Sequence, residues 1–181
     1  MRISALLLTS LVSLCLGAES TDASCMETKP DVYEAIHQRE AKLALTLDTK
    51  DWDRLSESMT QDIVYDSRPL GPDYGGLSVG LEEVIENTKR AFGDANVAHH
   101  VSNAVIRLNC QATEANVTTY VVWSRWEPNA LHDPKKTFRI YERCDDVFVV
   151  DDGNWKLKYS LVTNLAPKVE NPYFNDDTDN E

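Results

Sequence analysis

The sequence has 181 residues, with 18 basic and 30 acidic side chains and a net charge of −12 at neutral pH. This length fits one domain with a substantial core. The strong negative charge argues against binding to nucleic acid or to anionic membranes, because both need basic surfaces.

The N-terminus has the three parts of a signal peptide. Arg2 supplies the positive charge, residues 3–17 are apolar or small, and Gly17 and Ala18 are small enough for cleavage. The apolar run is shorter than the roughly 20 residues that cross a bilayer. We therefore expect a secreted protein from which residues 1–18 are removed, leaving 17 basic and 30 acidic side chains and a net charge of −13.

Two helices are predicted next, after a polar leader at residues 19–28. Pro30 suits the first turn of a helix, whose apolar stripe ends near Leu47 and which breaks at residues 48–50. A short second helix is predicted from apolar side chains at helical spacing: Trp52, Leu55 and Met59.

The middle of the chain predicts a strand, a loop and a third helix. Residues 63–65 are typical of a strand, and residues 69–76 are dense in glycine and proline, as in a loop. The clearest helix follows Gly80, presents one apolar face as far as Phe92 and is ended by Gly93.

The second half of the chain predicts strands, rich in β-branched and aromatic residues: 98–110, 115–126, 137–150 and 154–164. Residues 151–153 form a hairpin signal between the last two, and the acidic tail at 167–181 is expected to be loose. A helix can bury its stripe only against another element. We therefore predict one α+β domain at 29–166, in which a curved antiparallel sheet wraps around the long first helix and leaves room for a pocket.

Several short motifs in this order resemble SnoaL-like proteins of the nuclear transport factor 2-like superfamily. They are residues 47–55, 62–66 and 99–103, together with Asp146 and residues 152–155. The resemblance covers about residues 30–165. It implies a cone-shaped α+β half-barrel.

Residues 47–55 also resemble scytalone dehydratase, a family that removes water from a phenolic polyketide. That family uses an aspartate at the end of the first helix and a histidine at the start of the third strand. Asp48 and His100 match those positions, so the resemblance implies that they form a catalytic acid–base pair.

Other pocket positions of that family carry different residues here. The second pocket histidine falls on Trp126, and the two pocket tyrosines fall on Leu47 and Ser67. The serine and the asparagine fall on Glu142 and Cys144. The resemblance thus implies that a substrate pocket is lined by Ser67, Trp126, Glu142 and Cys144.

Each candidate also has a structural interpretation. Asp48 is equally suited to capping the second helix. His99 and His100 point to opposite faces of a strand, so only one can face a pocket, and that one could be a core histidine. Tyr65, Trp126 and Tyr141 could line an aromatic pocket, although aromatic residues on strands more often fill a core.

Secretion allows a disulfide and a glycan. Cys25, Cys110 and Cys144 remain after signal cleavage. In an antiparallel meander Cys110 lies at a hairpin end, out of register with Cys144, so we predict a Cys25–Cys110 disulfide and a free Cys144 near the pocket. Asn116 begins a glycosylation motif that also recurs by chance. Asn116 and Trp126 have the same parity on one strand, so Asn116 can face solvent while Trp126 faces the pocket only if a bulge separates them.

Two functions stay open. The first is a cofactor-free lyase, isomerase or cyclase acting on a small apolar or phenolic compound, and the alternative is a secreted binding protein with the same pocket and no chemistry. No serine-hydrolase, zinc-helix, phosphate-loop or dinucleotide motif is present, so we expect neither a metal nor a cofactor. The expected partner is a small apolar or aromatic ligand, without nucleic acid or membrane. Relatives of this fold often form dimers or trimers, so a homodimer and a homotrimer are both open.

Overall fold

A computed structural model of the protein describes residues 29–72, 75–128 and 137–166. The predicted signal peptide, the leader and the acidic tail lie outside the described residues. No helix within the described residues is both long enough and apolar enough to cross a membrane.

The described residues form a mixed α+β domain, as predicted. Its elements, in chain order, are α1 (Pro30–Asp48), η2 (Trp52–Glu57), β1 (Met59–Asp66), η3 (Arg68–Leu70), β2 (Leu77–Val79), α2 (Leu81–Phe92), β3 (Asn96–Leu108), β4 (Glu114–Trp126), β5 (Thr137–Asp151) and β6 (Asn154–Asn164). The long helix, the Gly80-initiated helix and the four long strands all lie where the sequence predicts them, within two residues at each end.

The predicted second helix is a short 3₁₀ turn, and Met59 is not part of it. Ser58 N–H donates to the Leu55 carbonyl, a bond that closes the turn three residues back. The Ser58 carbonyl then accepts from Leu157 N–H at 2.8 Å. The sheet therefore takes up the chain one residue later, and Met59 begins β1.

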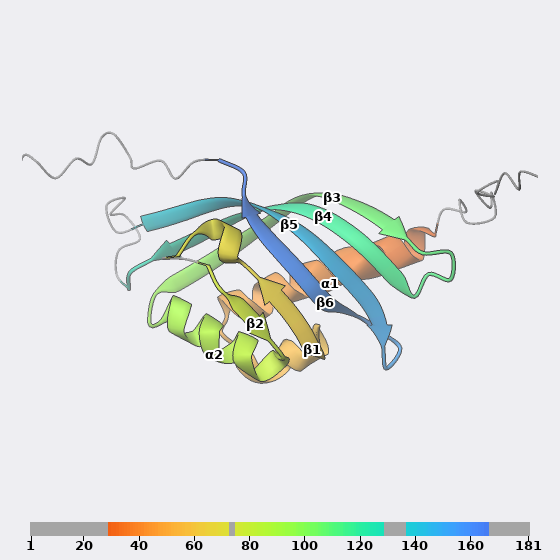
Figure 1. The fold of residues 1–181 in the computed structure, drawn as a ribbon, viewed down its shortest axis with the longest axis horizontal. Coiled ribbons are helices and arrows are strands. Elements are labelled where there is room, and N and C mark those ends of the chain that lie inside the picture. The colour runs from red at the N-terminus through yellow and green to blue at the C-terminus, as the bar shows by residue number, and fades with distance from the viewer. Residues whose placement is uncertain (1–28, 73–74, 129–136, 167–181) are drawn as a thin grey trace, which may run out of the picture.

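The strands form one six-stranded sheet in the order β2-β1-β6-β5-β4-β3. The β1–β6 pair is parallel, and the other neighbouring pairs in the described sheet are antiparallel. A bulge between Ser102 and Val105 bends β3, and Asn103 there has a φ of 57°. The curved sheet arches over α1, while α2 lies beside β1 and β2 (Figure 1).

The apolar core lies at one end of this half-barrel. Ile36 of α1, Leu55 of η2, Ile63 of β1 and Phe148 of β5 are fully buried together. A second, smaller cluster joins the sheet to η3, and it contains Leu70, Val121, Ile140, Cys144 and Val162. Because α2 and the end of α1 do not fill the space over the middle of the sheet, a cavity remains there.

Candidate active site

The last residue of α1 is bonded to the start of β3. The Asp48 carboxylate accepts a hydrogen bond from His99 N–H at 3.0 Å and contacts His99 Nδ1 at 2.6 Å. Both side chains are mostly buried, with exposed fractions of 15% for His99 and 21% for Asp48. A carboxylate at Nδ1 places a proton on that nitrogen and leaves Nε2 as the basic one. Asp48 is therefore not the cap of η2, whose N-cap residue is Asp51.

The predicted partner of Asp48 was His100, and that prediction was wrong. His99 pairs across the sheet with Trp123, and Trp123 pairs with Ile140, so these three residues share the inner face. His100 pairs with Val122, and Val122 with Tyr141, on the outer face. Side chains alternate along a strand, so an alignment one residue out of step selects the histidine on the wrong side.

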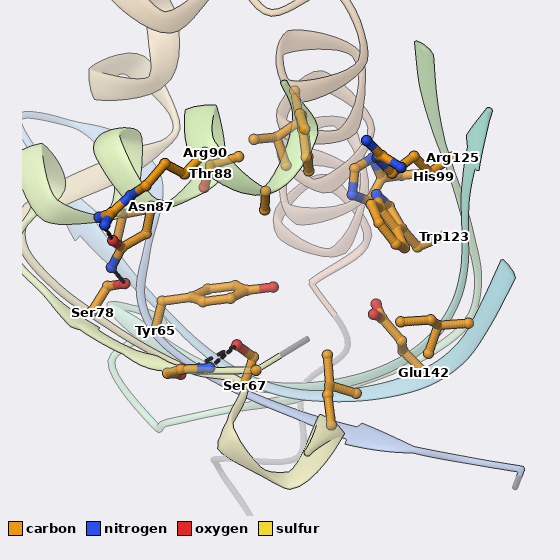
Figure 2. A pocket seen from close by; sticks show the side chains of 18 of the residues that line it. Tyr65, Ser67, Ser78, Asn87, Thr88, Arg90, His99, Trp123, Arg125 and Glu142 are labelled. Carbon is orange, nitrogen blue, oxygen red and sulfur yellow. Dashed lines mark hydrogen bonds between the residues drawn. The ribbon is translucent and has the colours of Figure 1, made fainter. Parts of the chain in front are cut away.

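His99 lines a cavity of about 810 Å³ between α2, the end of α1 and the inner face of the sheet. This volume lies within the range of small-molecule sites. Tyr65 and Glu142 extend into the cavity on the side opposite α2, while His99 and Trp123 lie together on its sheet wall (Figure 2). Among the described residues, His99 is the one histidine of the lining.

Aromatic rings surround the imidazole. The Phe92 ring lies 6.0 Å from the His99 ring and 6.0 Å from the Trp123 ring, centroid to centroid. Phe138 meets Trp123 edge to face at 5.9 Å. These three rings, from α2, β4 and β5, build an apolar wall suited to a flat ligand. None of these three residues was predicted to line a pocket, although Trp123 has the same parity on β4 as the buried Val121.

Trp126 was predicted to line the cavity, and it does not. The β4–β5 register runs without interruption from Glu114 to Trp126, so no bulge separates Asn116 from Trp126. Asn116 is exposed, and Trp126 has the same parity on the outer face. Without a bulge, Asn116 cannot face solvent while Trp126 faces the cavity, and the tryptophan that lines the cavity is Trp123.

Tyr141 also lies outside the cavity, because it follows His100 and Val122 on the outer face and is 50% exposed. Tyr65 and Ser67 do line the cavity, as predicted. Ser67 Oγ accepts from Gly76 N–H at 3.0 Å, so this hydroxyl holds the loop before β2. Gly75 is required there, because a Cβ at that position would overlap the Ser67 carbonyl.

Glu142 lies on the inner face of β5 and lines the cavity, as predicted. Its side chain is 7% exposed, and burial raises the pKa of this carboxyl to about 7. Burial also raises the pKa of the Tyr65 hydroxyl well above its usual value, and the charge of Glu142 adds to that effect. The Tyr65 phenol is therefore a hydrogen-bond donor at neutral pH, and the Glu142 carboxyl is a donor in its protonated form, which prevails below about pH 7.

Behind Glu142 lies a smaller cavity of about 80 Å³, lined in part by Cys144, Glu40 and Asp146. Burial raises the pKa of Glu40 and that of Asp146 to about 7. Cys144 is a free, buried thiol, as predicted, and burial raises its pKa well above the usual value. It lies opposite Thr119 in the middle of β4, far from Cys110 beyond the end of β3. Cys25 lies outside the described residues, so the Cys25–Cys110 disulfide stays a prediction.

Polar side chains cover another part of the cavity wall. Asn87 donates to Ser78 Oγ at 2.7 Å and accepts from Arg90, which ties α2 to β2. Arg125 lines the same cavity near His99, and its guanidinium contacts Glu127 at 3.4 Å. The wall thus combines an apolar side with hydrogen-bonding groups, as small-molecule sites do.

The chemistry that this arrangement supports is proton transfer. Within the described residues, no three histidine, cysteine, aspartate or glutamate side chains are grouped so as to hold a metal ion. The site instead holds an oriented imidazole, a phenol and a carboxyl whose pKa is raised to about 7, around one cavity. The imidazole can remove a proton from a ligand in the cavity. The neutral acids can then stabilise the negative charge that develops.

Comparison with protein families gives one match, to the model of the SnoaL-like domain, over residues 31–160. A comparison with curated proteins finds no match.

Solved structures share the fold. A Novosphingobium aromaticivorans protein, named provisionally as a scytalone dehydratase, is 20% identical with a TM-score of 0.63, over 78% of this chain and 92% of that one. ActVI-ORFA from Streptomyces coelicolor is 16% identical with a TM-score of 0.60, over 74% and 97%. A Catenulispora acidiphila protein solved in complex with S-DNPA is 14% identical with a TM-score of 0.60, over 75% and 95%. At these identities the likeness concerns the fold alone.

Proposed function

The chain belongs to the SnoaL-like domain family, and we propose that it is a cofactor-free enzyme that moves a proton on a small apolar or phenolic compound. The observation that supports this proposal is the pair of hydrogen bonds between the Asp48 carboxylate and His99 beside the cavity. Asp48 is the positioning residue, and His99 is the catalytic base.

The reaction class is a lyase, isomerase or cyclase reaction that begins next to a carbonyl. His99 Nε2 removes a proton from the carbon beside the carbonyl, and the C–H electron pair forms an enolate. In an elimination this pair then forms a carbon–carbon double bond and expels a β-hydroxyl group. The hydroxyl takes the proton from the imidazolium and leaves as water, which returns His99 to its neutral form. General acid–base catalysis of this kind contributes about 10² to 10⁴ in rate.

The substrate class follows from the lining. The rings of Phe92, Trp123 and Phe138 favour a flat aromatic compound. The volume of about 810 Å³ admits one or a few fused rings. An anionic carboxylate or phosphate is disfavoured at the Glu142 end of the cavity, because it would lose its hydration there and would face three buried acids that become negative above about pH 7.

We propose that the enzyme acts outside the cell. Residues 1–18 have the pattern of a signal peptide, and exposed Asn116 is accessible for a glycan on the outer face of the sheet. The Cys25–Cys110 disulfide would form in that oxidising environment.

A binding protein with the same cavity and no chemistry is the second candidate. The observation that favours it is the single histidine in the described lining, since Trp123 occupies the neighbouring place on the wall. Such a protein would hold its ligand without exchanging a proton.

The two functions are separated by the exchange of C–H protons of 2-tetralone, a bicyclic aromatic ketone, in heavy water. An enzyme of the proposed type accelerates deuterium uptake beside the carbonyl above the buffer rate, as followed by proton NMR. Calorimetric binding of 2-tetralone without accelerated exchange would instead establish the binding protein.

A further inference from the structure

Glu142 is a buried acid on the inner face of β5. The residue is 7% exposed, and its carboxyl projects from β5 into the cavity (Figure 2). Within the described part of the chain, no hydrogen bond or ion pair joins it to another side chain. Because the carboxyl points into the cavity and makes no such bond, it is placed to bond a ligand there.

The groups that surround Glu142 do not supply a charge partner. Tyr65 of β1 faces it across the cavity, and Cys144 and Asp146 follow on β5. Glu40 of α1 and His99 of β3 border the same inner space, while Arg90 of α2 and Arg125 of β4 lie on the cavity wall without a contact to Glu142. Burial favours the neutral form of the Glu142 carboxyl, which carries an O–H donor.

We propose that Glu142 is the ligand-binding acid of this cavity, and that its carboxyl O–H, together with the Tyr65 hydroxyl across the cavity, donates a hydrogen bond to a neutral oxygen of the substrate, a ketone or quinone carbonyl. Glu142 projects from the sheet wall below Trp123 and His99, and the Tyr65 hydroxyl points toward that wall (Figure 2). A carbonyl held there is stabilised as its enolate forms, because the donors are aimed at the oxygen that gains charge. The stabilisation of the enolate rests on the proposed function. The hydrogen bond from Glu142 to the ligand does not, because it forms with or without catalysis.

The test compares 2-tetralone with tetralin, which has the same rings and no oxygen, by isothermal titration calorimetry. Titrations are made at about pH 6 and about pH 8, on either side of the pKa of about 7. We expect 2-tetralone to bind about tenfold tighter than tetralin at the lower pH, and this preference to fall severalfold at the higher pH.

Three variants complete the test. Glu142→Gln keeps a neutral donor of similar shape, so it retains the ketone preference and loses its pH dependence. Glu142→Leu removes this donor and leaves that of Tyr65, so the preference for the ketone falls severalfold and no longer depends on pH. Glu114→Gln removes the same charge from an exposed position on β4 and behaves as the unaltered protein.

The proposal is overturned if the unaltered protein binds 2-tetralone and tetralin equally, or if the preference for the ketone grows as the pH rises. It is also overturned if Glu142→Gln keeps the full pH dependence. Failure of proton exchange on 2-tetralone with the preference intact would reject the enzymatic function alone. Both conclusions can be drawn from the unaltered protein if a variant does not fold.

Discussion

His99 and His100 are consecutive residues of β3 whose side chains lie on opposite faces of the sheet. His99 contacts Asp48 and lines the cavity, whereas His100 is exposed beside Val122 on the outer face. The two residues therefore share a strand and a side-chain type but differ in access to a ligand. This difference makes each histidine the control for the other.

Asp48→Asn tests the positioning role of the aspartate. The amide can donate to His99 Nδ1 as well as accept from it, so the fixed tautomer is lost. We expect ¹⁵N NMR of the imidazole to show a mixture of the two neutral tautomers in place of the Nδ1-protonated form. Exchange on 2-tetralone should fall at least tenfold with ligand binding retained. An unchanged tautomer and an unchanged rate would remove Asp48 from the mechanism.

Stability should depend on pH through the buried acids. The pKa of Glu40 is raised from 4.5 to about 7 in the folded protein. At pH values between these two, the carboxyl is therefore protonated in the folded state and ionised in the unfolded state. The folded protein is thus favoured near pH 5 and loses that advantage as the pH rises to about 7. The loss is on the order of 1 to 3 kcal/mol for this group.

Urea unfolding from about pH 5 to pH 8 measures this slope. Glu40→Gln should flatten it, while Glu34→Gln, at an exposed position on the same helix, should leave it unchanged. Equal slopes in the unaltered protein and in Glu40→Gln would show that Glu40 is not protonated in the folded state.

Peptide mapping without reduction should find Cys25 joined to Cys110 and an unmodified Cys144 in protein purified from a secretory host. Buried Cys144 should react with iodoacetamide only after unfolding, because its thiol is buried and its raised pKa leaves little thiolate. A peptide joining Cys110 to Cys144 would contradict the strand register, in which Cys144 lies opposite Thr119.

Expression in a eukaryotic secretory host tests the glycan. The secreted chain should begin at Glu19 and carry extra mass that peptide-N-glycosidase removes. Asn116→Gln should abolish the extra mass without changing ligand binding, because this side chain lies on the outer face. A secreted protein of unmodified mass would show that the motif is not used.

The sequence predicted the elements well because their periodicity is strong. The stripe of α2 and the alternation in β6 each specify one buried face, and both elements lie where they were expected. The 3₁₀ turn was assigned as a helix because Trp52 and Leu55 have helical spacing in either form.

The site was predicted only in part, because a face depends on register. Asp48, Tyr65 and Glu142 were identified, yet His100, Trp126 and Tyr141 belong to the outer face. A single-residue shift on β3 or β4 exchanges one face for the other, and sequence periodicity is weak where both faces carry aromatic residues. The even spacing of Asn116 and Trp126 was the signal that Trp126 points away from the cavity.

The role of His99 as the catalytic base is tested by comparing His99→Gln with His100→Gln in deuterium uptake by 2-tetralone. Glutamine removes the base and retains a polar side chain at each position. We expect His99→Gln to lower the rate by about 100-fold or more, toward the buffer rate, while 2-tetralone still binds. His100→Gln should keep the rate within about twofold of the unaltered protein. Equal rates in the two variants, or a loss confined to His100→Gln, would show that His99 is not the catalytic base.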